Sequence, residues 1–252
     1  MNREDNPIDK EFPLNENIHL EYCQRVIEQF PDMVLAHQAG KSSFHQEGKS
    51  ILEFLVGQAM KLCAGSCNPK SINSTLARLL EERDAARPTV YFYSSRDAHG
   101  YMSNFARYAV MVDGKKYRTS EHYYQSKKYE GTYWETKVRN ADGPMKAAQI
   151  GRDKRGPLRK DWNSVRDDVM RKVVEAKFRQ HADLAERLLA TGNAKLIERT
   201  TDDTYWGCGN SGTGKNMLGV ILMEIRTMLR AEKADQIRAD IMKMPDKPDP
   251  IC

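Results

Sequence analysis

Apolar residues in the first third of the chain recur at helical spacing in three consecutive stretches. Residues 17–29 and 50–64 each carry such a stripe, and a third begins at Asn68-Pro69, where proline fits the first turn of a helix. We therefore predict three helices that pack into a small module. Gly57, in the second of them, is expected to allow a neighbouring helix to approach closely.

The pattern changes after a polar run at residues 81–84 that leads to Pro88. Because proline disfavours helix at the residue before it, we predict a boundary between domains here. Short β-prone runs follow at residues 90–93 and 109–112, and the Asp113-Gly114 pair is typical of a hairpin turn. Helical spacing then dominates the chain, over residues 120–129, 143–150, 166–181, 182–190 and 216–231.

A few strands followed by many helices, without β-α-β alternation, predict an α+β fold that is predominantly helical. We expect three parts. A helical module spans residues 1–88, and a mainly α domain with a few short strands spans residues 89–232. Residues 233–252, with three prolines near the end, are expected to form a flexible tail.

Composition narrows the class of protein. Of 252 residues, 40% are apolar and 30% are charged, which is ordinary for a globular protein. No stretch approaches the roughly 20 apolar residues of a membrane span, and the first residues are polar and acidic, so we expect a cytoplasmic protein. The five cysteines are scattered and odd in number, which predicts reduced thiols, and they complete no zinc-binding pattern.

Charge is distributed unevenly along the chain. Residues 1–88 hold 10 Lys and Arg against 13 Asp and Glu, whereas the remainder holds 30 against 22. A basic C-terminal part suits an anionic partner such as a nucleotide phosphate or a nucleic acid. A solvated basic surface without a ligand would have the same composition, so charge alone does not decide.

Three clusters carry residues that are suited to chemistry. In the first, Ser120 is expected to cap a helix on which Glu121, Gln125 and Lys128 share one face. That face places an acid, an amide and an amine in line. An exposed polar face with a Glu-to-Lys ladder would show the same spacing.

The second cluster places Asp203 close to Trp206, a combination that suits a sugar and a stacked base but also occurs in plain turns. The third is a glycine-rich segment from Gly207 to Asn216, directly before the last helix. Its backbone amides could cradle a phosphate, or it could be a flexible loop capped by Asn216. The segment resembles a Walker loop, but Asn216 stands where that loop needs Ser or Thr, so we exclude an NTPase.

In chain order, these pieces resemble the NADAR family over about 140 residues, from Tyr91 to Arg230. The matching residues are Ser103-Asn104-Phe105, Ser120 to Gln125, Lys128, Ala148, Gly151-Arg152, Asp161-Trp162, Met170, Ala176-Lys177-Phe178, Leu188 to Gly192, Glu198, Asp203 to Gly207, Gly214 to Gly219 and Glu224-Ile225-Arg226. The resemblance implies a hydrolase that cleaves the N-glycosidic bond between ribose and a base. No metal, flavin or nicotinamide fingerprint is visible in the sequence, so we expect hydrolysis without a cofactor. The base would belong to an ADP-ribosylated guanine or to a phosphorylated ribosylamino-pyrimidine of riboflavin biosynthesis.

The resemblance and the chemistry of the reaction together assign roles. We expect Glu121, Lys128 and Asp203 to be catalytic. Glu121 would stabilise the cationic ribose or activate water, and Asp203 would handle a proton or bind ribose hydroxyls. Lys128 would pair with an anion or attack the anomeric carbon to form a Schiff base. The residues expected to bind substrate are Asn104, Phe105, Gln125, Trp206, Gly207, Gly214, Lys215 and Asn216.

Two other functions fit the same residues. The second domain could bind ADP-ribose or a nucleotide without turnover. The N-terminal module could contact tRNA, because Gly48-Lys49-Ser50, the run from Phe54 to Lys61 and the run from Gly65 to Lys70 resemble the tail of GatB/YqeY proteins. A partner of that kind would be nucleic acid, whereas the acidic balance of the module is unfavourable for phosphate binding. Trp162 is expected either in the pocket or only in the core.

Overall fold

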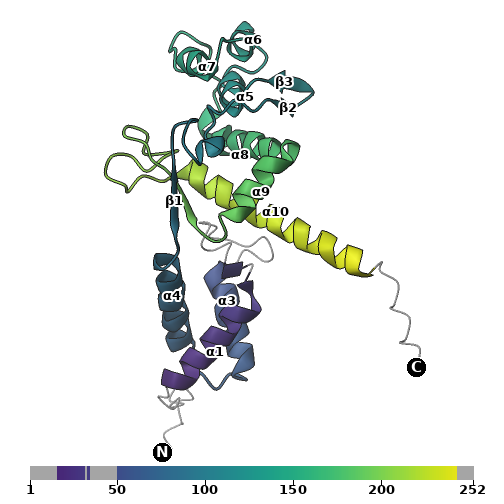
Figure 1. Ribbon diagram of the computed structural model, residues 1–252. Coiled ribbons are helices and arrows are strands. Elements are labelled where there is room, and N and C mark those ends of the chain that lie inside the picture. Colours follow the sequence, from purple (N-terminus) through teal and green to yellow (C-terminus); the bar gives the residue numbers. More distant parts are fainter. Residues whose placement is uncertain (1–15, 32, 35–49, 243–252) are drawn as a thin grey trace, which may run out of the picture. The chain divides into compact units, whose positions relative to one another are not determined.

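The computed structural model describes residues 16–31, 33–34 and 50–242 of the chain. The chain divides into two compact units, Met1–Arg87 and Pro88–Cys252. The N-terminal unit contains α1 (Glu16–Gln29), α3 (Ile51–Leu62) and α4 (Pro69–Ala85), which pack pairwise against one another (Figure 1). The three predicted helices are therefore confirmed. No helix in the described part is long and apolar enough to cross a membrane.

Local sequence signals explain where these helices begin. The Ser50 hydroxyl accepts a hydrogen bond from the backbone N–H of Glu53, whose carboxylate accepts one from the Ser50 N–H, so the two residues form a capping box. Asn68 caps α4. The role expected for Gly57 is wrong, because a Cβ there would meet no atom within 4 Å. Gly57 lies on an exposed side of α3, so no neighbouring helix requires its small size.

Four cysteines lie in the described residues, and all four are buried free thiols: Cys23, Cys63, Cys67 and Cys208. Burial raises the pKa of Cys23 and of Cys67 to about 11, so both remain protonated at neutral pH. Cys252 lies outside the described residues.

The second unit is predominantly helical with a few short strands, which confirms the predicted α+β class. Its elements are β1 (Thr89–Phe92), η1 (Gly100–Met102), β2 (Val110–Val112), β3 (Lys115–Tyr117), α5 (Ser120–Lys127), α6 (Tyr133–Arg139), α7 (Pro144–Gly151), α8 (Trp162–Gln180), α9 (Ala182–Ala190), β4 (Lys195–Glu198) and α10 (Met217–Met242).

The strands form two separate two-stranded sheets. β2 and β3 are antiparallel and joined by the predicted turn, in which Asp113 and Gly114 both have positive φ, 53° and 71°. β1 pairs in parallel with β4, which was not predicted, and Phe92 stands opposite Glu198. This second pairing brings the start of the unit next to a segment about 100 residues later in the chain, and α10 packs against β4.

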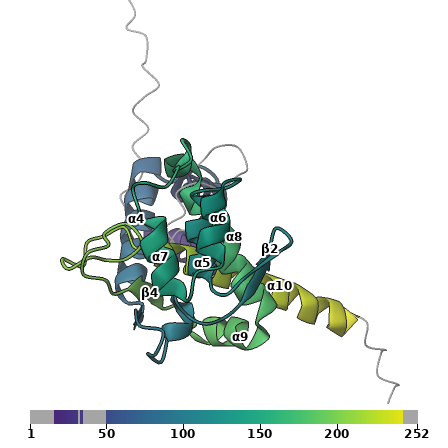
Figure 2. The ribbon, with the colours of Figure 1, turned by 90° about the horizontal axis from the view of Figure 1, so that it is seen from above.

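Helix α5 lies at the centre of the unit. It packs against α6, α7, α8 and β3, and the view from above in Figure 2 shows α5, α6 and α7 side by side. Helix α10 is longer than predicted, because it continues to Met242 through residues expected to be a flexible tail. Residues 231–240 contain Ala, Glu, Lys, Gln and Arg, which are strong helix formers, and no proline. Residues 243–252 of that predicted tail lie outside the described part.

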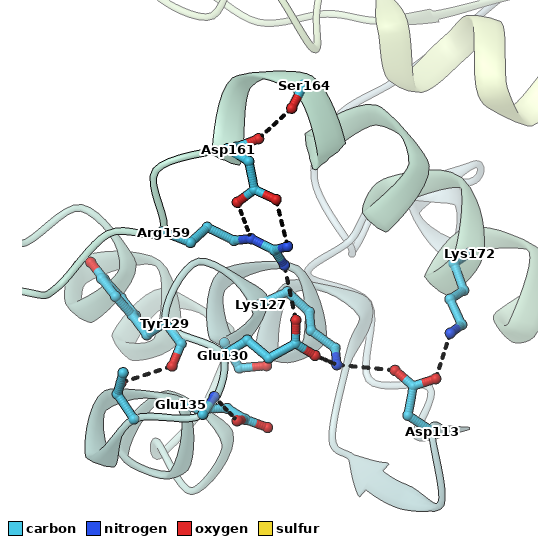
Figure 3. Close-up of polar contacts among 12 residues, drawn as sticks. Asp113, Lys127, Tyr129, Glu130, Glu135, Arg159, Asp161, Ser164 and Lys172 are labelled. Atoms are coloured by element: carbon cyan, nitrogen blue, oxygen red, sulfur yellow. Dashed lines mark hydrogen bonds and ion pairs between the residues drawn. The ribbon is translucent and has the colours of Figure 1, made fainter.

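A chain of ion pairs fixes the end of α5 from outside (Figure 3). Lys127, buried despite its charge, contacts the carboxylates of Asp113 at 3.0 Å and of Glu130. The complete chain of pairs runs through Lys172, Asp113, Lys127, Glu130, Arg159 and Asp161. The pKa of Asp113 falls to about 2, chiefly through its bond to Lys172. Arg159 also joins this network to the end of α5, because its backbone N–H donates to the carbonyl of Lys128.

Candidate active site

Helix α5 is buried along its whole length, which excludes an exposed polar ladder on this face. All eight of its residues are buried, including the acid Glu121 and the amide Gln125. The helix is capped by Thr119 rather than by Ser120, since the Thr119 hydroxyl accepts a hydrogen bond from the backbone N–H of His122. Thr119 has the extended backbone that a cap requires, with φ −151° and ψ 165°, and Ser120 is already helical.

Glu121 is held in position from two sides. Its backbone N–H donates to the carbonyl of Asn104 at 3.1 Å, and its carboxylate accepts a hydrogen bond from the Gln125 amide at 2.8 Å. Burial raises the pKa of Glu121, and the carboxylate of Asp203 adds to this effect. The Gln125 hydrogen bond and the positive charges of Lys128 and Arg152 oppose it. The site therefore concentrates an acid in a water-poor environment beside two cations.

The end of α7 supports the Gln125 amide. A Cβ built on Gly151 would lie 2.0 Å from Gln125 Oε1 and 2.6 Å from its Cδ. The absence of a side chain at Gly151 is thus what allows α7 and α5 to pack closely at this point. Gln125 Oε1 is buried and has no hydrogen-bond partner among the described residues.

Lys128 follows directly after α5 and lies against two aromatic rings. Its Nζ donates to the carbonyl of Gly151 at 3.0 Å and lies 5.7 Å from the ring centroids of both Tyr124 and Trp162. Burial lowers the pKa of Lys128, although the charge of Glu121 opposes the change. Among the predicted residues, Glu121, Gln125 and Lys128 are therefore brought together.

Aromatic rings form one wall of the site. Tyr124 contacts Trp162 at a centroid distance of 5.1 Å and Trp206 at 5.4 Å, and Tyr205 contacts Trp206 at 5.1 Å. Trp162 is buried, but its contact with Lys128 places it beside the catalytic candidates as well as in the core. Trp206 keeps part of its surface accessible, as a stacking surface must.

Asp203 reaches the site from the loop after β4. Its Oδ1 accepts hydrogen bonds from the backbone N–H groups of Tyr205 at 2.9 Å and Trp206 at 2.7 Å. The same carboxylate thus folds the turn that presents Trp206 and also acts electrostatically on Glu121. The predicted Asp–Trp turn and the predicted acid–amide–amine face therefore belong to one site.

The glycine-rich loop does not form the predicted cradle of free backbone amides. The backbone N–H groups that already donate to protein oxygens are those of Gly209, Asn210, Gly212, Thr213, Gly214, Lys215, Asn216, Met217 and Leu218. Gly207 and Gly214 serve close packing, because a Cβ on either would lie within 2.5 Å of a neighbouring atom. The side chain of Lys215 is exposed, so it is the cation that this loop can offer to an anion.

Asn216 likewise has a structural partner for each end of its amide. Its Oδ1 accepts from the backbone N–H of Glu198 at 2.9 Å, and its Nδ2 donates to the carbonyl of Leu196 at 2.8 Å. The side chain therefore fastens the start of α10 to β4. Asn216 adopts a positive φ of 51°, which asparagine tolerates better than most residues.

Asn104 and Phe105 lie on the segment before β2. Asn104 is buried, donates through Nδ2 to the sulfur of Met170 at 3.2 Å, and leaves Oδ1 without a partner in the described protein. Phe105 is half-buried beside it. Within residues 16–31, 33–34 and 50–242, no three His, Cys, Asp or Glu side chains are placed to hold a metal ion.

Three residues near Glu121 were not among the predicted site residues: Tyr124, Arg152 and Glu198. All three are among the residues that match the NADAR family, and that match was the signal in the sequence that could have identified them. Burial, together with the carboxylates of Asp203 and Glu121, raises the pKa of Glu198 to about 7. Sequence spacing gave no reason to place Glu198 here, because its position depends on the unpredicted strand β4.

Comparison with known proteins agrees with this arrangement. The NADAR domain model matches residues 91–230, more than half of the chain. The chain belongs to the NADAR domain family. N-glycosidase YbiA of Escherichia coli (strain K12) is 51% identical over 144 residues, which cover 57% of this chain and 90% of that protein. An N-glycosidase of Nostoc punctiforme is 38% identical over 145 residues, covering 56% of this chain and 93% of its own.

The NMR structure of Escherichia coli YbiA is similar in fold, with a TM-score of 0.56 and 49% sequence identity, over 59% of this chain and 88% of that one. A riboflavin biosynthesis protein of Vibrio vulnificus is 39% identical to the NADAR segment, which covers 38% of that protein. The expected class of enzyme, a hydrolase of N-glycosyl compounds, is confirmed by these relatives. The matched segments lie in the second unit, where the site is.

Proposed function

We propose that the NADAR unit hydrolyses the bond between the anomeric carbon of a phosphorylated ribose and a nitrogen of a base. The observation that carries this proposal is the buried carboxylate of Glu121, held by Gln125 and placed beside Lys128. Breaking an N-ribosyl bond builds positive charge on the ring oxygen and anomeric carbon. A fixed carboxylate in a water-poor site stabilises that charge more strongly than water does.

Lys128 has two chemical roles that an experiment separates. As an ammonium ion, it pairs with Glu121 or with a substrate anion. As a free amine, which burial favours by lowering its pKa, it attacks the anomeric carbon while the base leaves with the bonding electrons. The opened sugar would then form an imine with Nζ, which water hydrolyses. Borohydride added during turnover reduces such an imine and attaches the ribosyl mass to Lys128, whereas the ionic role gives no adduct.

The ends of the substrate are assigned from the remaining contacts. Trp206 stacks on the base, and the unpartnered amide oxygens of Asn104 and Gln125 accept hydrogen bonds from it or from ribose hydroxyls. Phosphate binding falls mainly to side chains, since most backbone N–H groups of the loop already donate to protein oxygens. Lys215 Nζ lies 5.2 Å from the Tyr205 ring centroid, and the Arg166 guanidinium lies 3.6 Å from the same centroid, so two cations flank this position.

Two substrates test the proposal: ADP-ribosyl-guanine in DNA and a ribosylamino-pyrimidine phosphate. The expected result is release of the free base from one of them, detected by mass. Glu121→Gln should lower turnover at least 100-fold with an unchanged melting temperature, because a positioned acid or base commonly supplies about that much. Near-wild-type turnover by this variant would refute the assignment. Binding of ADP-ribose without release of base from either substrate would support the non-enzymatic alternative instead.

We propose that the N-terminal unit contacts tRNA, as its resemblance to the tail of GatB/YqeY proteins implies. A gel shift of the full chain with tRNA at low and high salt tests this role. A shift that weakens steeply with salt supports it, because phosphate contacts release counterions. Absence of a shift at low salt excludes it and leaves the chemistry of the NADAR unit unaffected.

A further inference from the structure

Glu198 is fixed in place by its backbone and leaves its carboxyl group unused by the protein. Its N–H donates to Asn216 Oδ1 at 2.9 Å, and its carbonyl accepts from the N–H of Cys208 at 2.9 Å. Gly207 packs against the same carbonyl, where a Cβ would lie 2.9 Å away. No hydrogen bond or ion pair of its carboxyl group occurs among the described residues, although the side chain is partly buried. Such rigid placement of a spare acid is characteristic of a functional group.

Burial and the carboxylate of Asp203 raise the pKa of Glu121 as well, but Glu121 and Glu198 differ in their other neighbours. Glu121 has a hydrogen-bond donor, Gln125, and two cations, Lys128 and Arg152, which favour its ionised form. The charges acting on Glu198 are the carboxylates of Asp203 and Glu121, and both favour its protonated form. Its neighbours on the packed elements, Phe92 on β1 and Asn216 before α10, are uncharged. Environments that separate two carboxyl groups in this way assign one as the anion and the other as the acid.

We propose that Glu198 is a catalytic carboxylic acid that donates its proton to the leaving nitrogen of the base. This inference rests on the proposed function. As the bond between the anomeric carbon and the nitrogen breaks, the electron pair stays on the nitrogen, which takes the proton of Glu198. Glu121 remains ionised and stabilises the ribosyl cation. Water then adds its oxygen to the anomeric carbon and returns a proton to Glu198, so the enzyme is restored and the net reaction is hydrolysis.

A pair of substrates with different leaving groups tests this role in the full-length protein. One is whichever N-ribosyl substrate the wild type cleaves, whose base departs poorly without a proton. The other is a nitrophenyl riboside 5-phosphate, whose nitrophenolate departs without one. Glu198→Gln should lose at least about 100-fold in kcat on the N-ribosyl substrate and less than about tenfold on the nitrophenyl substrate. Glu121→Gln should lose activity on every substrate that the wild type cleaves, because it acts on the sugar.

The pH profile gives a second, independent readout. Since the pKa of Glu198 is about 7 and the acid must be protonated, wild-type kcat/KM for the N-ribosyl substrate should fall as pH rises above 7. In Glu198→Gln the residual activity should not show this fall above pH 7, which we call the alkaline limb of the profile. Exposed Glu186→Gln serves as the control for loss of one negative charge and should keep both the rate and the limb.

The outcomes separate the two proposals. If the wild type cleaves an N-ribosyl substrate but Glu198→Gln retains its kcat within tenfold, or keeps the alkaline limb, the role of Glu198 is overturned and the proposed function stands. If the wild type cleaves no N-ribosyl substrate, both fall. A melting temperature of Glu198→Gln equal to or above that of the wild type shows that lost activity does not come from a lost fold.

Discussion

Replacing Gly151 with alanine tests whether the close packing of α7 against α5 positions the carboxylate of Glu121, the proposed catalytic group. The new Cβ would lie 2.0 Å from Gln125 Oε1, 2.6 Å from its Cδ and 2.8 Å from its Cβ, and the Gln125 amide donates to Glu121 at 2.8 Å. Because no real contact is that short, Gln125 must move. Overpacking of this kind costs about 1–3 kcal/mol, and losing a hydrogen bond to a charged group costs about 1.5–3 kcal/mol.

We therefore expect Gly151→Ala to lower the melting temperature of the NADAR unit by several degrees, at about 2–4 °C per kcal/mol for a unit of this size. Turnover should fall by roughly tenfold to 100-fold, because a shift of about 1 Å in a catalytic group has effects of this order. Tryptophan fluorescence reports this transition selectively, since Trp134, Trp162 and Trp206 all lie in the second unit.

A double-mutant cycle isolates the contact. In a Gln125→Ala background the two nearest atoms, Oε1 and Cδ, are absent and only the Cβ at 2.8 Å remains, so Gly151→Ala should cost measurably less there than in the wild type. Gly57→Ala, in the other unit, is the matched control and should change neither the fluorescence transition nor turnover. Additive effects of the two substitutions, or wild-type turnover by Gly151→Ala, would refute the proposed coupling between α7 and Glu121.

Three further substitutions follow from the fold. Gly57→Ala should stabilise the N-terminal unit by about 0.5–1 kcal/mol, measured by circular dichroism, because alanine favours helix and its Cβ meets nothing. Lys177→Met should remove a pH dependence: burial lowers the pKa of Lys177 from 10.5 to about 7, so the unfolded chain binds more protons between these values. Between pH 7 and pH 9 the free energy of unfolding of the wild type should therefore increase by more than that of the variant, as measured by urea titrations followed by tryptophan fluorescence. Asn216→Ala loses its bonds to Leu196 and Glu198 and should destabilise the NADAR unit by about 1–3 kcal/mol, whereas an unchanged urea midpoint would contradict this.

Local signals in the sequence predicted most of the regular structure. Stripes of apolar residues located the long helices, and Asp113-Gly114 located the hairpin, because both depend on residues close in the chain. β4 was missed, since four residues carry little periodicity and its partner β1 is about 100 residues away. Thr119 was overlooked as a cap because Ser120 beside it is equally suited by composition. The first ten residues of the predicted tail, 233–242, were misjudged, because helix formers precede its prolines.

The site was predictable in part for the same reason. Glu121, Gln125 and Lys128 lie on one helix, so their proximity follows from spacing once a helix is assumed. Whether that face is buried does not follow from spacing, because burial depends on α6, α7 and α8 packing around α5. The glycine-rich loop was misinterpreted because its composition shows flexibility but not which carbonyls its amides reach.

The three carboxyl groups of the site raise the free energy of the resting protein. Burial and mutual repulsion act against ionisation of Glu121 and Glu198, while backbone bonds hold Asp203 and Glu198 close by. A folded protein selected for stability alone would replace such a cluster with apolar residues. Lys128 and Arg152 offset part of this cost at Glu121, and a ribosyl cation among the carboxyl groups would offset more of it. The electrostatic cost in the resting protein and the stabilisation of the transition state are therefore the same interaction, seen without and with positive charge on the ribose.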